Sequence, residues 1–394
     1  NSIDALRCLD TTDWHKFVED TSAVESVLRQ DPTGIYPAMD FATRDRYRHI
    51  IEKLASHTPV YSEKEIAEKA MRMAMAAAKN GATEPMRHVG YYLVDRGLSD
   101  MKVQLGMRIS PTDRIRNVCR RFAFPLYVMS VLGVMIVSAL YFAVLAGGSG
   151  LNGWGLWCIG LLALLGTSNL AVALVNCPAM LLVTPERLPR MDFAKGIPES
   201  FCSMVVVPTI LNDKAGIEKL IRSLEVAFLA NRDDNLHFGL LTDFCDAPTE
   251  KLAEDQTLLG FARTEIEKFN RKYPNPHYDS FFLFHRPRLW NPQEGVWMGY
   301  ERKRGKLADL NRLLRGKSNG SFELVTGSAP MLARIKYVIT LDSDTQLPRE
   351  SARQFIETMA HPLNHARYDE KKQRVIGGYG VLQPRVTMSL SGMN

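Results

Sequence analysis

One long stretch of the chain lacks charge entirely. No Asp, Glu, Lys or Arg occurs between Phe122 and Pro185, although these four residue types make up 23% of the sequence. The stretch is rich in Leu, Val, Ala, Trp and Phe, and a glycine-rich run separates two apolar segments, 124–146 and 154–180. Each segment reaches the roughly 20 residues that an α-helix needs to cross the hydrocarbon core of a bilayer. The absence of charge therefore predicts a transmembrane helical hairpin over residues 122–185.

Cations flank this stretch on both sides. They are Arg114, Arg116, Arg120 and Arg121 before it, and Arg187, Arg190 and Lys195 after it. Lys and Arg near membrane spans stay on the cytoplasmic side, and an even number of spans returns the chain to the side on which it started. Both polar parts, residues 1–121 and 186–394, are therefore expected in the cytosol of a multi-pass membrane protein. A buried hairpin in a large soluble protein is the alternative, disfavoured because soluble cores seldom extend so far without a charge.

Three further features that the sequence lacks restrict the classes of function that fit it. The six cysteines show no paired or metal-like spacing, which is typical of free thiols in a reducing compartment. The net charge of +6 is modest and is partly explained by the membrane flanks, so it does not indicate a nucleic-acid partner. The sequence begins without an initiator Met or a signal peptide and stops just after an extended segment. We therefore expect a piece of a longer polypeptide.

Residues 1–121 are expected to form a helical domain. Ser62 and Glu65 have the spacing of a capping box, and the Ala/Met-rich run that they open ends at Asn80-Gly81. A second amphipathic helix is predicted over residues 43–56. The histidines of this domain show no metal-ligand spacing and are interpreted as structural or surface residues; they include His49, His57 and His88. Nothing in the domain indicates catalysis, and a docking or regulatory role is the default.

Residues 186–394 alternate between apolar runs and helical patterns. The apolar runs lie at residues 203–207, 238–242, 280–284 and 337–341, and the helix candidates lie between them at 216–229, 249–270 and 305–314. Strands rich in Val, Ile, Leu and Phe that alternate with helices predict an α/β domain with a mostly parallel sheet buried on both faces. Such sheets bind ligands at the carboxyl ends of their strands. The polar residues that follow the runs there are Thr209, Asp243, Asp342 and Asp344.

Asp342 and Asp344 leave the fourth apolar run on the same side, two residues apart. Unpaired carboxylates would repel each other, and a divalent cation removes that repulsion. Mg²⁺ or Mn²⁺ favours carboxylate oxygens together with phosphate oxygens from a substrate. The alternative is a simple turn, because Asp and Ser are common at strand ends. The preceding apolar strand and a second strand that ends at Asp243 favour the metal site.

A basic segment precedes the fourth run. Residues 294–317 contain seven cations and three acids, and Gly305-Lys306 stands at the start of a predicted helix. Backbone donors and an ammonium group at that position could bind a diphosphate. A solvated basic face or a contact with anionic lipid headgroups is the alternative. The P-loop pattern is absent.

Together these features resemble an inverting, processive membrane glycosyltransferase of GT-A fold, with a Rossmann-like sheet. The strings that carry this resemblance are Val207-Pro208-Thr209, Leu240-Leu241-Thr242-Asp243, Gly305-Lys306 with Asn311, and Leu341-Asp342-Ser343-Asp344. Longer and more specific strings resemble the bacterial cyclic β-1,2-glucan synthases. They are Asp31-Pro32-Thr33-Gly34-Ile35-Tyr36-Pro37-Ala38-Met39-Asp40-Phe41, His285-Arg286-Pro287-Arg288-Leu289-Trp290-Asn291 and Gly378-Tyr379-Gly380-Val381-Leu382-Gln383-Pro384-Arg385.

This resemblance implies a UDP-glucose-dependent transferase of the bacterial inner membrane that makes cyclic β-1,2-glucan, an osmoregulated periplasmic glucan. It implies UDP-glucose, the growing glucan chain and membrane lipid as partners, and Mg²⁺ or Mn²⁺ to stabilise the charge of the leaving UDP. Carried over by position, the resemblance implies that Thr209 and Asp243 contact the uridine and that Lys306 neutralises the diphosphate. It implies that Asp342 and Asp344 bind the metal and the donor. It also implies that Gln383 and Arg385 line the donor or acceptor side. The candidate catalytic residues are Asp243, Asp342 and Asp344.

The family pattern continues beyond what this sequence contains. Members carry a later acidic general base, a Gln/Arg-x-x-Arg-Trp segment for the growing chain, further membrane spans and a phosphorylase-like domain, none of which occurs before Asn394. The chain is therefore expected to supply the donor and metal half of the site, to bind UDP-sugar weakly and not to polymerise by itself. The remaining parts of the same polypeptide are expected partners.

Two other functions fit part of the pattern. A membrane-tethered nucleotide-sugar sensor or scaffold would also lack the general base. A phosphoaspartate phosphatase or ATPase would use Asp342 as nucleophile and Asp344 as general acid. That motif normally opens its domain, however, and no second Asp-Asp pair follows it here. Continuation of the reading frame into an acidic segment and an Arg-Trp motif would favour the transferase over the sensor.

Overall fold

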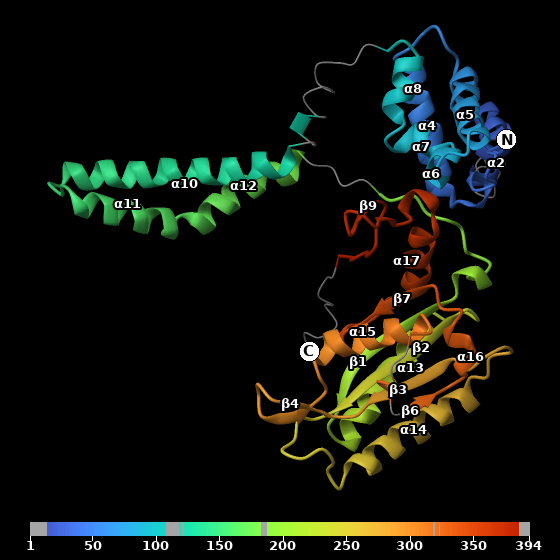
Figure 1. The fold of residues 1–394 in the computed structure, drawn as a ribbon. Helices are drawn as coiled ribbons and strands as arrows, with labels where there is room; N and C mark the ends of the chain where they lie inside the picture. The colour runs from blue at the N-terminus through green and yellow to red at the C-terminus, as the bar shows by residue number, and fades with distance from the viewer. Residues whose placement is uncertain are drawn as a thin grey trace, which may run out of the picture. The chain divides into compact units, whose positions relative to one another are not determined.

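The computed structural model describes residues 14–107, 118–119, 122–182, 187–317, 320–322 and 324–385 (Figure 1). The chain divides into two compact units. The first takes its residues from 1–55, 62–97 and 189–394, and the second from 56–61 and 98–188. The predicted division into three parts at residues 121 and 185 stays a prediction.

The second unit carries the apolar helices. α10 (Ala123–Gly148) has a mean hydropathy of 2.4 in its most apolar window, and none of that window is buried. α11 (Trp154–Gly166) and α12 (Ser168–Leu182) meet at a bend of 46°. By length and composition, the described residues hold one helix able to cross a membrane, or two if the bent pair counts as one span. One apolar helix of the predicted pair is therefore found, and a bent pair of shorter helices stands where the second was expected. The membrane hairpin itself stays a prediction.

The bend between α11 and α12 has a local cause. The hydroxyl of Thr167 donates to the carbonyl of Ala163 at 2.7 Å, and that of Ser168 donates to the carbonyl three residues before it at 2.7 Å. Such bonds between side chains and helix carbonyls often bend a helix. Tyr127 of α10 donates to Asn176 of α12 at 3.0 Å, so the chain folds back alongside α10 (Figure 1).

The amino-terminal part of the first unit is helical, as predicted. Its elements are α2 (Trp14–Thr21), α3 (Ala23–Leu28), η1 (Tyr36–Ala38), α4 (Phe41–Ser56), α5 (Glu63–Lys79), α6 (Glu84–Arg87) and α7 (Gly90–Val94). One more helix, α8 (Leu98–Gln104), belongs to the second unit. The predicted capping box is confirmed, because the Ser62 hydroxyl accepts from the backbone of Glu65 at 3.3 Å and the Glu65 carboxylate accepts from the backbone of Ser62 at 2.8 Å. The helix ends at Lys79 with Asn80 as its C-cap, so the predicted stop at Asn80-Gly81 is confirmed.

A five-stranded sheet forms the centre of the α/β part. Its strands are β1 (Ser203–Leu211), β2 (Leu236–Phe244), β3 (Phe281–Arg286), β6 (Leu324–Thr326) and β7 (Tyr337–Thr340). They lie in the order β6-β3-β2-β1-β7, and all neighbours are parallel except β6, which runs antiparallel to β3. The four apolar runs of the sequence are β1, β2, β3 and β7, so the predicted, mostly parallel α/β sheet is confirmed. The antiparallel edge strand β6 was not predicted.

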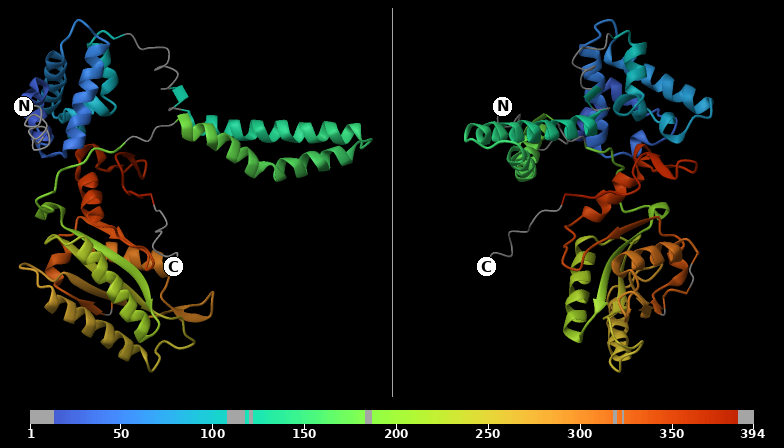
Figure 2. Two further views of the ribbon diagram at one scale, coloured as in Figure 1. Left: turned by 180° about the vertical axis from the view of Figure 1, so that it is seen from behind. Right: turned by 60° about the vertical axis from the view of Figure 1, so that its left-hand side comes forward.

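Helices cover both faces of this sheet (Figure 2). α13 (Lys214–Ala230) and α14 (Asp255–Lys272) pack on one face, where the Phe228 ring lies 4.8 Å from Phe281 and Phe269 lies 5.4 Å from the same ring. α15 (Arg302–Leu314) and α16 (Ala329–Leu332) pack on the other face, where Leu310 shares a buried cluster with Phe282. Residues 281 and 282 point to opposite faces because side chains alternate along a strand. Both faces are therefore buried, which explains the continuous apolar runs.

The remaining elements are short. β4 (Leu289–Asn291) pairs with β5 (Val296–Met298), and β8 (Arg367–Asp369) pairs with β9 (Arg374–Gly377). α17 (Ser351–Ala360) follows the loop after β7, and two 3-10 turns, η2 (Glu199–Phe201) and η3 (Pro362–Asn364), complete the described elements.

The loop that begins at Asp31 joins the amino-terminal helices to the α/β part. Asp31 accepts a hydrogen bond from the buried His88 at 3.0 Å, so the interpretation of His88 as a structural residue is confirmed. Asp40, at the end of the loop, pairs with Arg190 at 2.9 Å. His361, just after α17, meets His88 edge to face with 5.4 Å between the ring centroids. The string 31–41 therefore helps to pack the amino-terminal helices against the α/β part.

Candidate functional site

Three adjacent strands bring predicted site residues to one edge of the sheet. In the register of β1 and β2, Thr209 lies opposite Thr242, and Ile210 lies opposite Asp243. On the other side of β1, Val206 lies opposite Thr340 of β7, and Asp342 follows two residues later. All three strands are parallel, so these residues meet at the carboxyl edge.

Asp243 is the centre of a buried charge cluster. Its side chain is almost fully removed from solvent, and its two oxygens accept from Arg286 Nε at 3.0 Å and Nη2 at 3.1 Å. Lys306 Nζ lies 3.1 Å from the same carboxylate, and Arg286 also donates to Asp309 at 2.8 Å. Two cations thus neutralise two carboxylates, which offsets the large cost of moving a charge out of water.

Lys306 connects β1 to β2. Its ammonium group contacts the carboxylate of Asp243 and donates to the backbone carbonyl of Thr209. Burial lowers the pKa of Lys306, although the charge of Asp243 opposes that change. An ammonium group has three hydrogens, so these two contacts leave one donor for a ligand. The structure therefore brings Thr209, Asp243 and Lys306 together.

The first turn of α15 is built around the same cluster. Glu301 and Arg302 have φ values of 53° and 46°, a left-handed conformation that is strained for residues with a side chain. Arg286 donates to the carbonyl of Arg302 at 3.3 Å and holds this turn in place. A Cβ on Gly299 would overlap the carboxylate of Asp243, and a Cβ on Gly305 would overlap backbone. Both glycines are therefore needed for the close approach.

Asp342 reaches the same helix from the other side. Its carboxylate pairs with Lys303, which lies one turn before Lys306 on α15. The side chain of Asp342 is 60% exposed, and Asp344 is exposed as well. α15 thus links the ends of β1, β2 and β7.

The donor set of the predicted metal site is partial. Among the described residues, no group of three or more His, Cys, Asp or Glu side chains could hold a metal ion. Asp342 and Asp344 supply oxygen ligands, which suit Mg²⁺ or Mn²⁺ when a substrate and water provide the remaining oxygens. Lys303 would have to release Asp342 for such binding. The residues fit a hard cation only in the presence of a phosphate-bearing ligand.

Gln383 and Arg385 lie apart from this cluster in the described contacts. Both are exposed in the irregular segment after β9, near the end of the described residues. Within that part of the chain, no hydrogen bond or ion pair joins them to Asp243, Lys306 or Asp342. Their assignment to the donor or acceptor side stays a prediction.

The roles of Arg286 and its neighbours were missed in the sequence. Arg286 ends β3 and lies opposite Asp243 of β2, so a basic residue at a strand end was the only available signal. His285 lies beside them with Nδ1 2.9 Å from the Thr242 hydroxyl, and burial lowers the pKa of His285 to about 4. Arg288 forms a buried pair with Asp255 at 2.5 Å behind the site.

The basic segment before β7 is largely neutralised. Its ion pairs join Arg302 to Asp246 at 2.8 Å, Arg304 to Glu301 at 3.6 Å, Arg312 to Asp309 at 2.7 Å, Lys306 to Asp243 at 3.1 Å, and Lys303 to Asp342. Of these pairs, the one between Lys306 and Asp243 is buried, whereas the cations of the others are half or more exposed.

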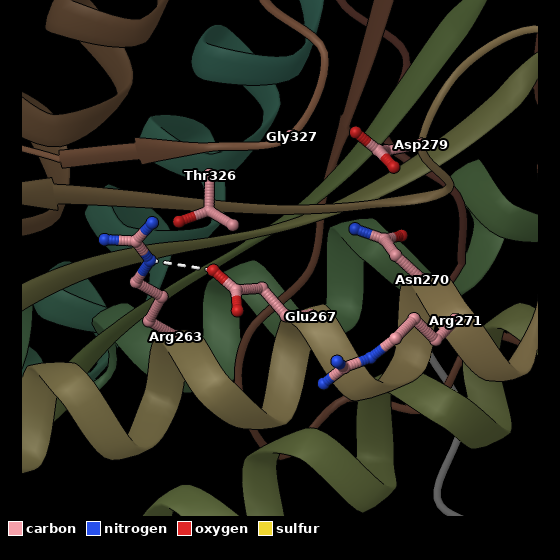
Figure 3. Close-up of a pocket in the computed structure, with 7 residues that line it drawn as sticks. All are labelled: Arg263, Glu267, Asn270, Arg271, Asp279, Thr326 and Gly327. Carbon is pink, nitrogen blue, oxygen red and sulfur yellow. Dashed lines mark hydrogen bonds and ion pairs between the residues drawn. The ribbon is translucent and has the colours of Figure 1, made fainter.

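A shallow pocket lies at the opposite, amino end of β3 (Figure 3). It has a volume of about 560 Å³ and is lined by Arg263, Glu267, Asn270, Arg271, Asp279, Thr326 and Gly327. Arg263 and Glu267 form an ion pair at 2.8 Å across its floor on α14. None of the predicted site residues lines it.

The chain is similar in sequence to a characterised bacterial protein. No family model matches the chain. It is 36% identical, over 400 aligned residues that cover 99% of this chain, to the cyclic beta-(1,2)-glucan synthase NdvB of Rhizobium meliloti (strain 1021). The alignment covers 14% of that protein, so this chain spans a small part of its length.

Proposed function

The chain is homologous over 99% of its length to a segment of a cyclic β-(1,2)-glucan synthase, and from this we propose that it is the donor-binding part of such a glycosyltransferase. The resemblance to these synthases found in the sequence is thereby confirmed. The proposed enzyme is an inverting transferase of GT-A type that uses UDP-glucose to build cyclic β-1,2-glucan. The structural observation that supports the proposal is that two lysines of α15 contact the ends of three parallel strands. Lys303 pairs with Asp342 after β7, and Lys306 contacts Asp243 of β2 and Thr209 of β1.

The buried cluster suits the donor nucleotide. We assign Thr209 and Asp243 to the uridine side, where a carboxylate fixed by Arg286 offers an acceptor that needs no rearrangement. Lys306 carries its charge in surroundings from which water is largely excluded, and a charge there acts more strongly on a nearby diphosphate than one in water. The third hydrogen of its ammonium group is the donor assigned to the diphosphate.

The exposed aspartates suit the metal ion. Asp342 and Asp344 would hold Mg²⁺ or Mn²⁺ with oxygens of the diphosphate as further ligands. The bound ion would act as a Lewis acid that stabilises the charge of departing UDP. Lys303 keeps Asp342 neutralised until the ion and donor bind. Gln383 and Arg385 are assigned to the donor or acceptor side.

The proposed site belongs on the cytosolic side of the membrane. We propose that α10 and the bent pair α11–α12 cross the bacterial inner membrane as a hairpin, with both polar parts in the cytosol, where UDP-glucose is found. Membrane lipid, the growing glucan chain and the remaining parts of the same polypeptide, including a phosphorylase-like domain, are the partners of the proposed enzyme.

Titration of UDP-glucose tests the donor and metal assignments. Binding is measured on the detergent-solubilised protein with and without Mn²⁺. Asp342→Ala and Asp344→Ala should each weaken Mn²⁺-dependent binding at least about tenfold, because each removes a charged ligand. Asp234→Ala removes an exposed aspartate just before β2, at the opposite edge of the sheet from the candidate site; it is the matched control and should bind as the wild type does. Wild-type affinity in both variants would remove the metal assignment, and absence of UDP-glucose binding by the wild type would remove the donor.

A further inference from the structure

A pair of tryptophans stands at the same edge of the sheet as the charge cluster. In the hairpin of β4 and β5, Trp290 lies directly opposite Trp297, with 5.9 Å between the ring centroids. Trp290 is 48% exposed and Trp297 is half-buried. The hairpin projects from the end of β3 (Figure 1). An exposed tryptophan backed by a second, half-buried one is a candidate contact for a ligand or partner.

The hairpin is fastened to the charge cluster. Ala247 and Trp297 exchange two backbone hydrogen bonds of 2.9 Å each, which tie β5 to the segment just after β2. The chain then passes directly from Met298 to Gly299, which packs against the carboxylate of Asp243. The tryptophan pair therefore cannot move far without disturbing the site, and a ligand on it would be held at a fixed place beside the donor cluster.

The charges around the hairpin are balanced. Arg302 pairs with Asp246 at 2.8 Å and lies 3.7 Å from Glu294, and Arg304 pairs with Glu301 at 3.6 Å. An anionic lipid surface or a phosphate requires uncompensated positive charge. This surface favours an uncharged ligand that combines apolar faces with hydroxyl groups.

A glucose ring in a glucan has these properties. Its C–H faces pack on aromatic rings, and its hydroxyl groups bind neighbouring polar side chains such as the exposed Gln293. We propose that Trp290 and Trp297 form a stacking subsite for the uncharged glucan chain next to the donor site. This inference rests on the proposed glucan synthase function, because that function supplies the ligand.

Calorimetric titration with a β-1,2-linked glucooligosaccharide tests the subsite. The full polypeptide in detergent should bind the oligosaccharide about five- to tenfold more weakly when Trp290 is replaced by Ala, since an aromatic contact of this kind is lost. Trp290→Phe keeps a ring and should recover most of the affinity. Tyr368→Ala, which removes another exposed aromatic from the same domain, is the matched control and should have no effect. UDP-glucose affinity should be unchanged in all three variants.

The outcomes separate this subsite from the proposed function. Unchanged oligosaccharide affinity in Trp290→Ala, or no oligosaccharide binding by the wild type, would overturn the subsite. If Trp290→Ala no longer binds vesicles of phosphatidylethanolamine and phosphatidylglycerol but keeps its oligosaccharide affinity, the hairpin contacts the membrane instead. If the wild type binds the oligosaccharide through Trp290 but does not bind UDP-glucose, the donor assignment fails and the subsite stands.

Discussion

Asp243 shows at the scale of one residue how a buried charge is held. Taking a carboxylate out of water costs several kcal/mol, and both of its oxygens are compensated by Arg286 and Lys306. Removing one partner of such a buried group costs about 3–5 kcal/mol, because the other charge is left unpaired. Variants of these three residues would therefore mix effects on stability with effects on ligand binding. Gly299 gives a milder way to disturb the cluster.

Gly299→Ala should displace Asp243 without removing any charge. The new Cβ would overlap the carboxylate, so either Asp243 or the first turn of α15 must shift. We expect a loss of about 1–3 kcal/mol in the free energy of unfolding, as for other overpacked sites. We also expect weaker UDP-glucose binding. Thermal unfolding and UDP-glucose titration measure the two effects.

Gly260→Ala is the matched control for this substitution. Gly260 lies on α14, and a Cβ there would meet no other atom within 4 Å. Alanine is favoured over glycine inside a helix by about 1 kcal/mol, so this variant should be at least as stable as the wild type and bind the donor normally. If Gly299→Ala behaves in the same way, Asp243 is not held as tightly as the structure indicates.

At the scale of elements, strands that are buried on both faces of the sheet were the easiest to predict from the sequence. β1, β2 and β3 could be predicted because a strand covered on both sides has a continuous apolar sequence. β7 lies at one edge of the sheet and is only partly buried, but its sequence is still mostly apolar. β6, at the other edge, has only three residues and is too short to give such a run. The bend after α11 was not predicted because it depends on how the hydroxyls of Thr167 and Ser168 turn.

The residues of the candidate site could be predicted, but not how they pair. Thr209, Asp243 and Asp342 could be found from the sequence because parallel strands end at one edge, and Lys306 because it stands at a helix start. The pairing of Asp243 with Arg286 and Lys306 could not be predicted, since these residues are distant in sequence and meet only through the sheet register and the packing of α15. The sequence likewise did not single out Trp290 and Trp297, because it does not show that β4 and β5 pair them.

Two histidines within the strands make stability depend on pH. His237 at the start of β2 and His285 at the end of β3 are buried, and burial lowers the pKa of each from 6.5 to about 4. The unfolded chain binds protons at these sites below about pH 6.5, whereas the folded chain does not until about pH 4. The contribution of these histidines to the free energy of unfolding is therefore fully present above pH 6.5 and is lost as the pH falls toward 4. His361, whose pKa burial also lowers, acts in the same direction.

The expected loss can be measured by thermal unfolding across this pH range. Each histidine contributes at most about 1.4 kcal/mol per pH unit below 6.5. Burial raises the pKa of Glu357, so this carboxyl acts in the opposite sense and offsets part of the loss. His237→Gln should reduce the pH dependence, while His49→Gln, at an exposed position, should leave it unchanged. A transition midpoint that stays constant from pH 7 to pH 5 would contradict this account.

At the scale of the whole molecule, the apolar helices predict how many times the chain crosses the membrane. α10 is long and apolar enough to span a bilayer by itself, whereas α11 and α12 suffice only together. The backbone ladder continues through their bend, because Thr167 donates to Ala163 at 2.9 Å and Ala171 donates to Thr167 at 2.8 Å. A span needs all its backbone groups paired within the helix. This continuity favours one bent span over a re-entrant loop.

Cysteine labelling with a membrane-impermeant maleimide in cells tests the resulting topology. Single cysteines are placed at Ser149, at Lys64 and at Lys251, three exposed positions, in a background without the native cysteines. Two spans place Ser149 on the outer face and the other two positions in the cytosol. We therefore expect Ser149→Cys to react in cells whose inner membrane is intact, and Lys64→Cys and Lys251→Cys to react only after permeabilisation. If α11 and α12 formed a re-entrant loop, Lys64 and Lys251 would lie on opposite sides, and one of them would react in intact cells. The proposed donor site would need cytosolic UDP-glucose and is therefore compatible only with a cytosolic Lys251.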